Sequence, residues 1–307
     1  MRPKLCLLLF YLLHLLLLHQ FVKAQTVEYP CAASEMQRRA FDQNPHQLQQ
    51  QQRVDEQIHQ QLLRNPAGIL RSVIPFTLPV VVHVVHQNGS ENIDDAQVQR
   101  AIQHLNDAFA HQGYYADAGT GVKIPVQFCL AQRTPNNEKT AGVTRTQSPL
   151  TTLTMETQDQ ALKDMVRWDT RQYINIWVVA DINSKSLGAG VAGYAYYASA
   201  HGASFDGIVC ESRYFGKNPA NDVVLIHEMG HYLNSYHTFE GGCTNNFCDL
   251  EGDRVCDTPP DQAKHTGCLY NSCTTDAQDT RDLEALRPNW DLDGTVDWEE
   301  RKKLPKN

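Results

Sequence analysis

The stretch HEMGHYLNSYH, residues 227–237, places three histidines and one glutamate at a spacing that suits a metal ion. On a helix, residues four positions apart lie on one face, so His227 and His231 can present two imidazole nitrogens to the same ion, with Glu228 beside it. Zinc with three protein ligands keeps a fourth position for water, and a neighbouring carboxylate can take the proton of that water. The pattern therefore predicts a zinc site with Glu228 as general base.

His237 is the candidate for the third zinc ligand. It follows His231 by six residues, which is too far for both to lie on one face of a continuing helix. The helix must end and the chain must turn back, and this requires a residue that tolerates positive φ. Asn234 stands at that position, and Asn enters the left-handed region more readily than most residues other than Gly. A bare HExxH can arise by chance on a surface helix, but the third histidine and the turn residue argue against that reading.

The overall composition is that of an ordinary globular protein, with 307 residues, 41% of them hydrophobic and 20% charged. The formal net charge is −8, and no Lys/Arg cluster of the kind that binds phosphates appears. Because phosphate binding needs a basic face, these features argue against a nucleic-acid partner. An acidic balance is compatible with oxygen-rich metal sites.

Residues 1–24 have the form of a secretory signal peptide. Arg2 and Lys4 precede a Leu-rich stretch, and Ala24 supplies the small residue expected at a cleavage site. The alternative is a membrane anchor, which the short apolar run, interrupted by His14, disfavours. The mature chain is therefore expected to be secreted and extracellular, with no membrane partner.

Residues 25–72 form a Gln-rich segment that is predicted to be a propeptide. Its apolar residues are spaced as one helical face, which is expected to pack on another surface. These residues are Leu48, Val54, Ile58, Leu62 and Leu63. The alternative is a disordered N-terminal extension.

Residues 73–275 are predicted to form one compact domain that mixes strands and helices. Strands are expected at 78–86, 122–132, 173–180, 193–199 and 206–212, and helices at 93–112, 156–168 and 221–234. A Thr-rich loop is expected before the second helix, and Asn221 or Asp222 is placed to cap the third. Solitary histidines such as His83 are expected at the edge of the core or on the surface. The fold class is therefore α/β (α+β), with a loop-rich C-terminal part.

The cysteines indicate that disulfides staple this C-terminal part. Nine cysteines are present, and eight are left if Cys6 is removed with the signal peptide. Export to an oxidising compartment favours disulfides. Five of the cysteines crowd into the region after the histidine motif, namely Cys243, Cys248, Cys256, Cys268 and Cys273. Their pairing cannot be read from their spacing.

The residues after His237 resemble the pappalysin (cytophagalysin) family of metzincin zinc metalloproteases. Residues 238–243, TFEGGC, and residues 252–259, GDRVCDTP, look like the HTF-x-GGC and GD-x-V-x-DTP patterns of that family. An astacin would be expected to carry Glu directly after the third His. Upstream segments are also similar, so the resemblance covers about residues 76–275.

This resemblance implies a metzincin-like catalytic domain with a mixed twisted sheet and an active-site helix. It implies an endopeptidase that acts on a protein or peptide substrate, with zinc on His227, His231 and His237 and with Glu228 as general base. It also implies a calcium site in the loop after the helix, for which Asp253, Asp257 and Thr258 are candidates. Ordinary capping of turns by these residues is the alternative.

The resemblance further suggests a latency mechanism, because some relatives are kept inactive by a propeptide cysteine at the open zinc position. Cys31 is the only cysteine of the predicted propeptide, and a thiolate is a good zinc ligand. Its flanking residues depart from the usual Arg-Cys-Gly pattern of the family, so a disulfide is the alternative. If Cys31 serves the metal, seven cysteines remain, and Cys273 is the candidate for the odd one.

The C-terminal end departs from the family pattern. Metzincins continue past the third His to a Met-containing turn below the zinc site, whereas no Met follows Met229 in this chain. Residues 276–307 instead form a divergent tail with oxygen ligands spaced as in an EF-hand loop. These are Asn289, Asp291, Asp293, Thr295, Asp297 and Glu300, with Gly294 at the sharp turn. An acidic, solvated tail is the alternative, and a non-catalytic secreted protein that binds calcium and zinc is the alternative to the endopeptidase.

Overall fold

The computed structural model describes residues 31–64, 75–116, 123–244, 246–256, 258, 260–262 and 273. Some sequence predictions fall outside the described residues and stay predictions. They concern the signal peptide, the EF-hand-like loop, and the roles of Asp257 and Cys268. In the described part of the chain, no helix combines the length and the apolar character that crossing a bilayer requires.

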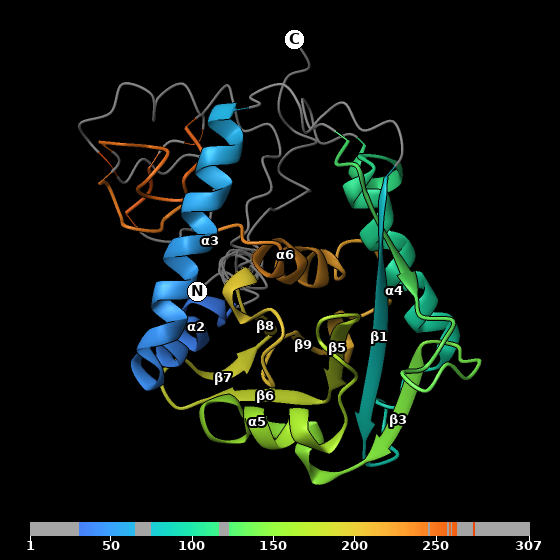
Figure 1. Ribbon diagram of the computed structural model, residues 1–307. Helices are drawn as coiled ribbons and strands as arrows, with labels where there is room; N and C mark the ends of the chain where they lie inside the picture. The colour runs from blue at the N-terminus through green and yellow to red at the C-terminus, as the bar shows by residue number, and fades with distance from the viewer. Residues whose placement is uncertain are drawn as a thin grey trace, which may run out of the picture.

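A six-stranded mixed sheet forms the centre of the molecule (Figure 1). Five strands follow one another in the order β2 (Val126–Leu130), β1 (Phe76–His86), β5 (Ile174–Val179), β9 (Ile208–Glu211) and β8 (Gly193–Ala195), and β3 (Val143–Gln147) also pairs with β1. All pairs are parallel except β8 with β9, which is antiparallel. The edge strand β8 therefore runs against the rest of the sheet.

The predicted strands of this sheet are confirmed, and they form because β-branched residues alternate between two cores. On β1, Val80, Val82 and Val84 pack into one core, while Val85 packs into the other. Parallel strands buried on both faces read as nearly continuous apolar runs, as in the VVVHVV segment of β1. The sheet is thus a wall between two apolar layers.

Helices complete these two layers. The three predicted helices of the domain are confirmed as α4 (Asp95–Phe109), α5 (Met155–Met165) and α6 (Val223–Tyr232). Helices α4 and α6 contribute to the first core, and α5 contributes to the second. Short 3-10 turns connect these elements at Gly113–Tyr115, Pro149–Thr151, Ala198–Ala200 and Ser212–Tyr214.

Four short strands were not evident from the sequence. In place of the predicted Thr-rich loop, the chain forms β3 and β4 (Thr152–Thr154). β4 joins β6 (Asp181–Ser184) and β7 (Gly188–Val191) in a separate three-stranded sheet. These strands have polar or glycine-rich sequences without alternation, so their backbone pairing leaves no hydrophobic signal.

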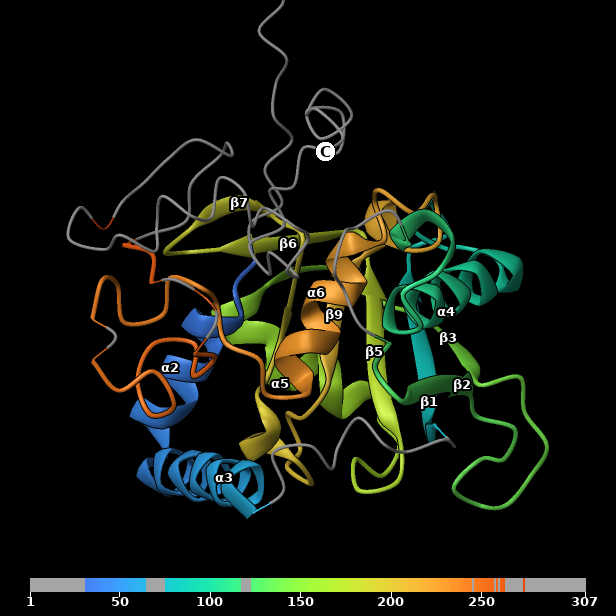
Figure 2. The same ribbon diagram turned by 90° about the horizontal axis from the view of Figure 1, so that it is seen from above.

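The N-terminal segment forms two helices, α2 (Ala33–Gln43) and α3 (Pro45–Arg64). Figure 2 shows both on the side of the molecule opposite α4. The predicted helix is confirmed, but the predicted packing of its apolar face is wrong for most of its members. Four of them are between 42% and 62% exposed, namely Leu48, Ile58, Leu62 and Leu63. The buried residue of α3 is Gln51, so this helix docks largely through polar contacts.

His83 lies in the middle of β1 and is fully buried, so its expected place at the core edge or surface is wrong. Its Nδ1 lies 2.7 Å from Thr144 Oγ1, and its Nε2 lies 2.9 Å from Asn175 Oδ1. Both ring nitrogens have polar partners, which makes a buried neutral imidazole tolerable. Burial lowers the pKa of His83 to about 4, and the hydrogen bond with Asn175 only partly opposes this shift.

We expect His83 to make folding stability depend on pH between about 6.5 and 4. The unfolded imidazole has a pKa of about 6.5, so below that pH the unfolded state binds a proton that the folded state refuses. Above about pH 6.5, His83 therefore does not lower the free energy of unfolding. At pH 5, we expect that free energy to be about 2 kcal/mol lower because of His83. Urea unfolding of wild type and His83→Gln at pH 7 and pH 5 measures this. Equal pH dependence in the two proteins would contradict the assignment.

Candidate metal centre

Helix α6 carries His227 and His231 one turn apart on its buried face, and it ends where the sequence predicts. The backbone NH of Asn234 donates to His231 O at 2.8 Å, and that of Ser235 donates to Gly230 O at 2.9 Å. Asn234 has φ +79°, which confirms the predicted left-handed residue. The chain then turns back toward the helix.

This turn brings His237 to the other two histidines. His231 Nε2 lies 2.9 Å from His227 Nε2 and 3.1 Å from His237 Nε2. All three rings are buried. Three ring nitrogens therefore converge on one point, although His237 lies outside the helix.

A backbone hydrogen bond points the converging nitrogen of His231 at the common centre. His231 Nδ1 donates to Ser235 O at 2.8 Å, so its Nε2 carries the free lone pair. Burial lowers the pKa of His231 to about 4, and burial together with His231 and His237 lowers the pKa of His227. His227 and His231 are therefore neutral near pH 7, and neutral imidazole is the form that binds metals.

The fourth group at this centre comes from the N-terminal segment. Cys31 Sγ and one nitrogen of each histidine all lie within 4.8 Å of one another. Cys31 thus lies in the histidine cluster rather than in a disulfide. Three imidazoles and one thiol are a donor set that fits a tetrahedral zinc ion.

Glu228 lies beside the cluster and is buried. Burial raises its pKa to about 8, against the opposing effect of hydrogen bonds with Cys31 and with the backbone of Ala195. Gly193 makes room for it, because a Cβ there would lie 3.0 Å from Glu228 Cγ. The edge strand β8 can therefore pass directly beside the carboxylate.

The cluster is surrounded by three further residues, and motif spacing did not reveal these three. Ser34 Oγ lies 3.0 Å from His237 Nδ1 and 3.4 Å from Tyr197 OH. The Tyr197 ring lies 5.6 Å from the His231 ring, and the His237 ring stacks on Phe239 at 4.6 Å. The signals in the sequence were indirect, namely the nearness of Ser34 to Cys31 and the tyrosine-rich GYAYYAS segment.

Asp222 stands at the N-cap of α6, but its side chain does not cap the helix, contrary to the sequence prediction. Its carboxylate instead accepts a hydrogen bond from Gly216 N at 2.6 Å and pairs with His104 of α4. Burial raises the pKa of Asp222, while the His104 contact opposes this. The carboxylate thus ties the start of α6 to α4 instead of satisfying the first turn of the helix.

The edge strand beside the centre is held by a buried polar cluster. Tyr194 OH donates to Asp159 Oδ1 at 2.7 Å, and Tyr196 OH donates to Asp159 Oδ2 at 2.9 Å. Lys163 Nζ lies 2.9 Å from the same carboxylate and donates to Phe205 O at 2.6 Å. Burial lowers the pKa of Lys163, and Asp159 opposes this. One carboxylate therefore anchors two side chains of the GYAYYAS segment.

Two disulfides staple the loops after His237, in agreement with the predicted C-terminal part. They join Cys243 to Cys273 and Cys248 to Cys256. The expectation that Cys273 is the odd cysteine is therefore wrong, because its partner lies within the same loop region. Spacing alone could not show this, since pairing depends on how the loops fold.

The candidate calcium ligands are only partly described. Asp253 Oδ1 accepts a hydrogen bond from Val255 N at 3.0 Å, and Thr258 N donates to Val255 O at 3.1 Å. These are turn contacts, and Asp257 lies outside the described residues. Calcium binding in this loop stays a prediction.

Comparison with known proteins confirms the resemblance to the pappalysin family. A model of the M43 peptidase family, described as pregnancy-associated plasma protein-A, matches residues 156–289. An extracellular metalloprotease of Pyricularia oryzae is 26% identical over 206 residues, which cover 63% of this chain and 60% of that protein. One of Colletotrichum graminicola is 28% identical over 211 residues, covering 65% and 63%. The chain thus spans about three fifths of the length of these relatives.

Solved structures show the same fold. A promirolysin mutant of Tannerella forsythia matches with a TM-score of 0.58 and 26% identity over 81% of this chain and 83% of that chain. Mirolysin in complex with a compound matches with a TM-score of 0.55 and 25% identity over 76% of this chain and 100% of that chain.

We expect Asp159→Ala to lower the free energy of unfolding by about 3–5 kcal/mol, because it leaves Lys163 buried without its carboxylate. Asp164 on the same helix is a matched control. It pairs with Arg167 at 2.9 Å, but its side chain is 54% exposed, so Asp164→Ala should cost far less than Asp159→Ala. Urea unfolding at neutral pH compares the two variants, and equal losses would refute the anchoring role of Asp159.

Proposed function

We propose that this chain, which is similar to the pappalysin family of metzincin metalloproteases, is a secreted zinc-dependent endopeptidase made as a latent precursor. His227, His231 and His237 would hold the zinc ion, and Glu228 would act as general base on a protein or peptide substrate. The observation that carries the proposal is the convergence of three buried imidazole nitrogens beside a buried carboxylate.

A bound zinc ion would lower the pKa of a coordinated water molecule and polarise the carbonyl group of the substrate. The part of Glu228 is to accept a proton and to return it to the leaving amine. Its Oε2 is buried and has no hydrogen-bond partner among the described residues, so that oxygen is available to accept the proton.

The edge strand β8 is the proposed binding place of the substrate backbone. An unpaired strand edge can take up an extended peptide through main-chain hydrogen bonds. The N-terminal segment already uses this edge, because Ala32 N donates to Gly193 O at 3.2 Å and Cys31 forms a parallel bridge with Gly193. The edge can therefore accept an extended main chain directly beside Glu228.

Latency is proposed to come from this same N-terminal segment. Cys31 occupies the position next to the three histidines where a water molecule would be needed, and the segment covers the strand edge. The match to a promirolysin extends over 81% of this chain, compared with 76% for a mirolysin. This difference is in keeping with an assignment of residues 25–72 as a propeptide. Calcium binding by the candidate loop and by residues 289–300 is part of the proposal only as a sequence prediction.

Cleavage of a mixed peptide library tests the proposed activity. The chain is cut between residues 64 and 75, separated from its N-terminal fragment, and assayed with and without a zinc chelator, next to Glu228→Ala. We expect cleavage that the chelator abolishes and that the variant reduces by at least about 100-fold, because the general base is lost. Stoichiometric zinc binding without any cleavage would instead support the non-catalytic metal-binding alternative.

The uncut chain tests latency. We expect Cys31→Ser to raise the peptide cleavage of the uncut chain by at least about 10-fold, because a hydroxyl is a much poorer zinc ligand than a thiolate. Cys129→Ser on β2 is the matched control, because Cys129 forms no disulfide and is not a member of the histidine cluster. Unchanged activity of uncut Cys31→Ser would speak against Cys31 as the latency residue.

A further inference from the structure

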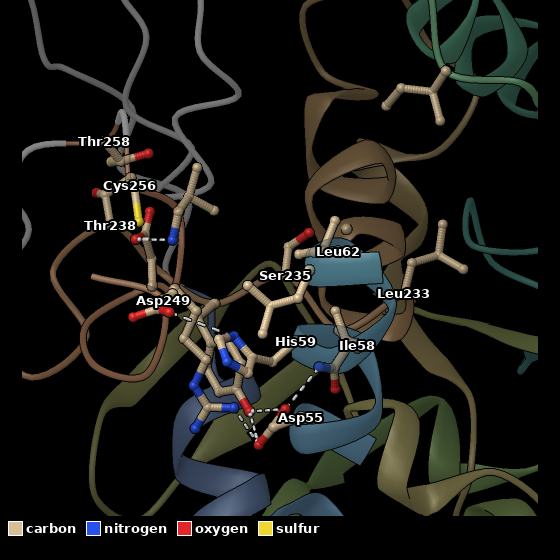
Figure 3. Close-up of a pocket in the computed structure, with 18 of the residues that line it drawn as sticks. Asp55, Ile58, His59, Leu62, Leu233, Ser235, Thr238, Asp249, Cys256 and Thr258 are labelled. Carbon is tan, nitrogen blue, oxygen red and sulfur yellow. Dashed lines mark hydrogen bonds and ion pairs between the residues drawn. The ribbon is translucent and has the colours of Figure 1, made fainter. Parts of the chain in front are cut away.

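A cavity of about 840 Å³ lies between helix α3 and the loops that follow α6. Figure 3 shows α3 along one side of it, with Asp55 toward its base and with Asp249 and Thr258 across from the helix. This place is separate from the Cys31 contact, yet it joins the same N-terminal segment to the turn that carries His237. The N-terminal segment therefore contacts the domain at a second place, beside this cavity.

Asp55 is the centre of that contact. Its Oδ1 accepts hydrogen bonds from Gln51 Nε2 at 2.8 Å and from Asn234 Nδ2 at 3.0 Å. Tyr236 OH lies 3.0 Å from both carboxylate oxygens, and Arg254 forms an ion pair with Oδ2. Asp55 is only 10% exposed. Three of its four partners belong to the domain.

These three domain residues are held in place by features other than Asp55. Asn234 is fixed in the left-handed conformation that the turn to His237 requires. Arg254 lies in the loop closed by the Cys248–Cys256 disulfide, and its guanidinium lies 4.7 Å from the centre of the Tyr236 ring. Tyr236 in turn packs against Tyr197 at 4.9 Å. A cation, an amide and a hydroxyl are thus pre-arranged around one point, and this is a geometry that recognises a carboxylate.

The rest of α3 offers little other reason to dock here. Its apolar side chains are largely exposed, and its buried residue is Gln51. Gln51 Nε2 also lies 2.8 Å from Asn234 Oδ1 and 2.8 Å from Tyr236 OH, so it adds to the same polar network. One turn further along, His59 Nδ1 lies 3.5 Å from Asp249 Oδ2. The helix is therefore held mainly by charged and polar contacts centred on Asp55.

We propose that Asn234, Tyr236 and Arg254 form a carboxylate-binding site on the turn of the candidate metal centre, and that Asp55 is its ligand. The site is a second anchor of the N-terminal segment, so cutting the chain between α3 and β1 does not by itself release the segment. The inference deepens the proposed latency, on which it rests for its biological meaning, but the contact requires neither zinc nor catalysis.

The test measures how fast the N-terminal fragment leaves after the full chain is cut. A recognition sequence for a specific protease is placed between residues 64 and 75, a fluorophore is attached at the N-terminus, and the loss of fluorescence anisotropy is followed after cleavage. We expect Asp55→Asn to speed release by at least about 10-fold, because it removes the charge that pairs with Arg254. Glu56→Gln is the matched control, since Glu56 is exposed and, among the described residues, accepts a hydrogen bond only from Gln60. We expect a change of less than about 2-fold.

Two further arms keep the result interpretable. Thermal unfolding of the uncut Asp55→Asn chain checks that the variant folds, and Tyr236→Phe tests the site from the domain side, with faster release expected there too. Equal release of wild type and Asp55→Asn would overturn the proposal, as would loss of the wild-type fragment within the mixing time. Cys31→Ser separates the two anchors. If only Cys31→Ser speeds release, the carboxylate site fails while latency through Cys31 stands, and if only Asp55→Asn does so, the reverse holds.

Discussion

The candidate metal centre depends on the left-handed backbone of one residue, Asn234 with φ +79°. A continuing helix would carry residue 237 away from the face that holds His227 and His231. The turn at Asn234 brings the His237 ring to within 3.1 Å of His231, measured between their Nε2 atoms. The same turn presents the Ser235 carbonyl to His231 Nδ1 and so fixes which ring nitrogen faces the centre. One backbone conformation thus sets both the ligand group and its orientation.

Buried polar groups, in addition to apolar contacts, connect this centre to its surroundings. Asp159 holds the edge strand, Asp222 ties α6 to α4, and Asp55 holds α3 against the turn. Each carboxylate receives several donors, which is the condition for burying a charge without a large penalty. Such contacts are directional, so they fix positions more sharply than an apolar surface does. That property suits a site whose groups must meet within a few ångströms.

The fold could be predicted where hydrophobic periodicity was strong. β1, β5 and the helices α4, α5 and α6 all appear where the pattern places them, because burial of regularly spaced apolar residues dominates their folding. The short strands β3, β4, β6 and β7 were missed because their sequences are polar or glycine-rich and pair mainly through the backbone. The apolar face of α3 was misjudged for the opposite reason. A periodic pattern suggested packing, yet the helix docks through Gln51 and Asp55 and leaves its leucines exposed.

The sequence by itself determined the group His227, His231, His237 and the need for a left-handed residue between the last two, because helix geometry and φ preferences are local properties. Neighbouring residues suffice to state them. The tertiary structure alone decided that Cys31, Ser34 and Tyr197 surround this group and that Cys273 pairs with Cys243. It also decided that Asp55 meets Asn234, Tyr236 and Arg254. These contacts join segments far apart in the chain, and their cause is the packing of two helices and a disulfide-closed loop around one sheet, which no local pattern encodes.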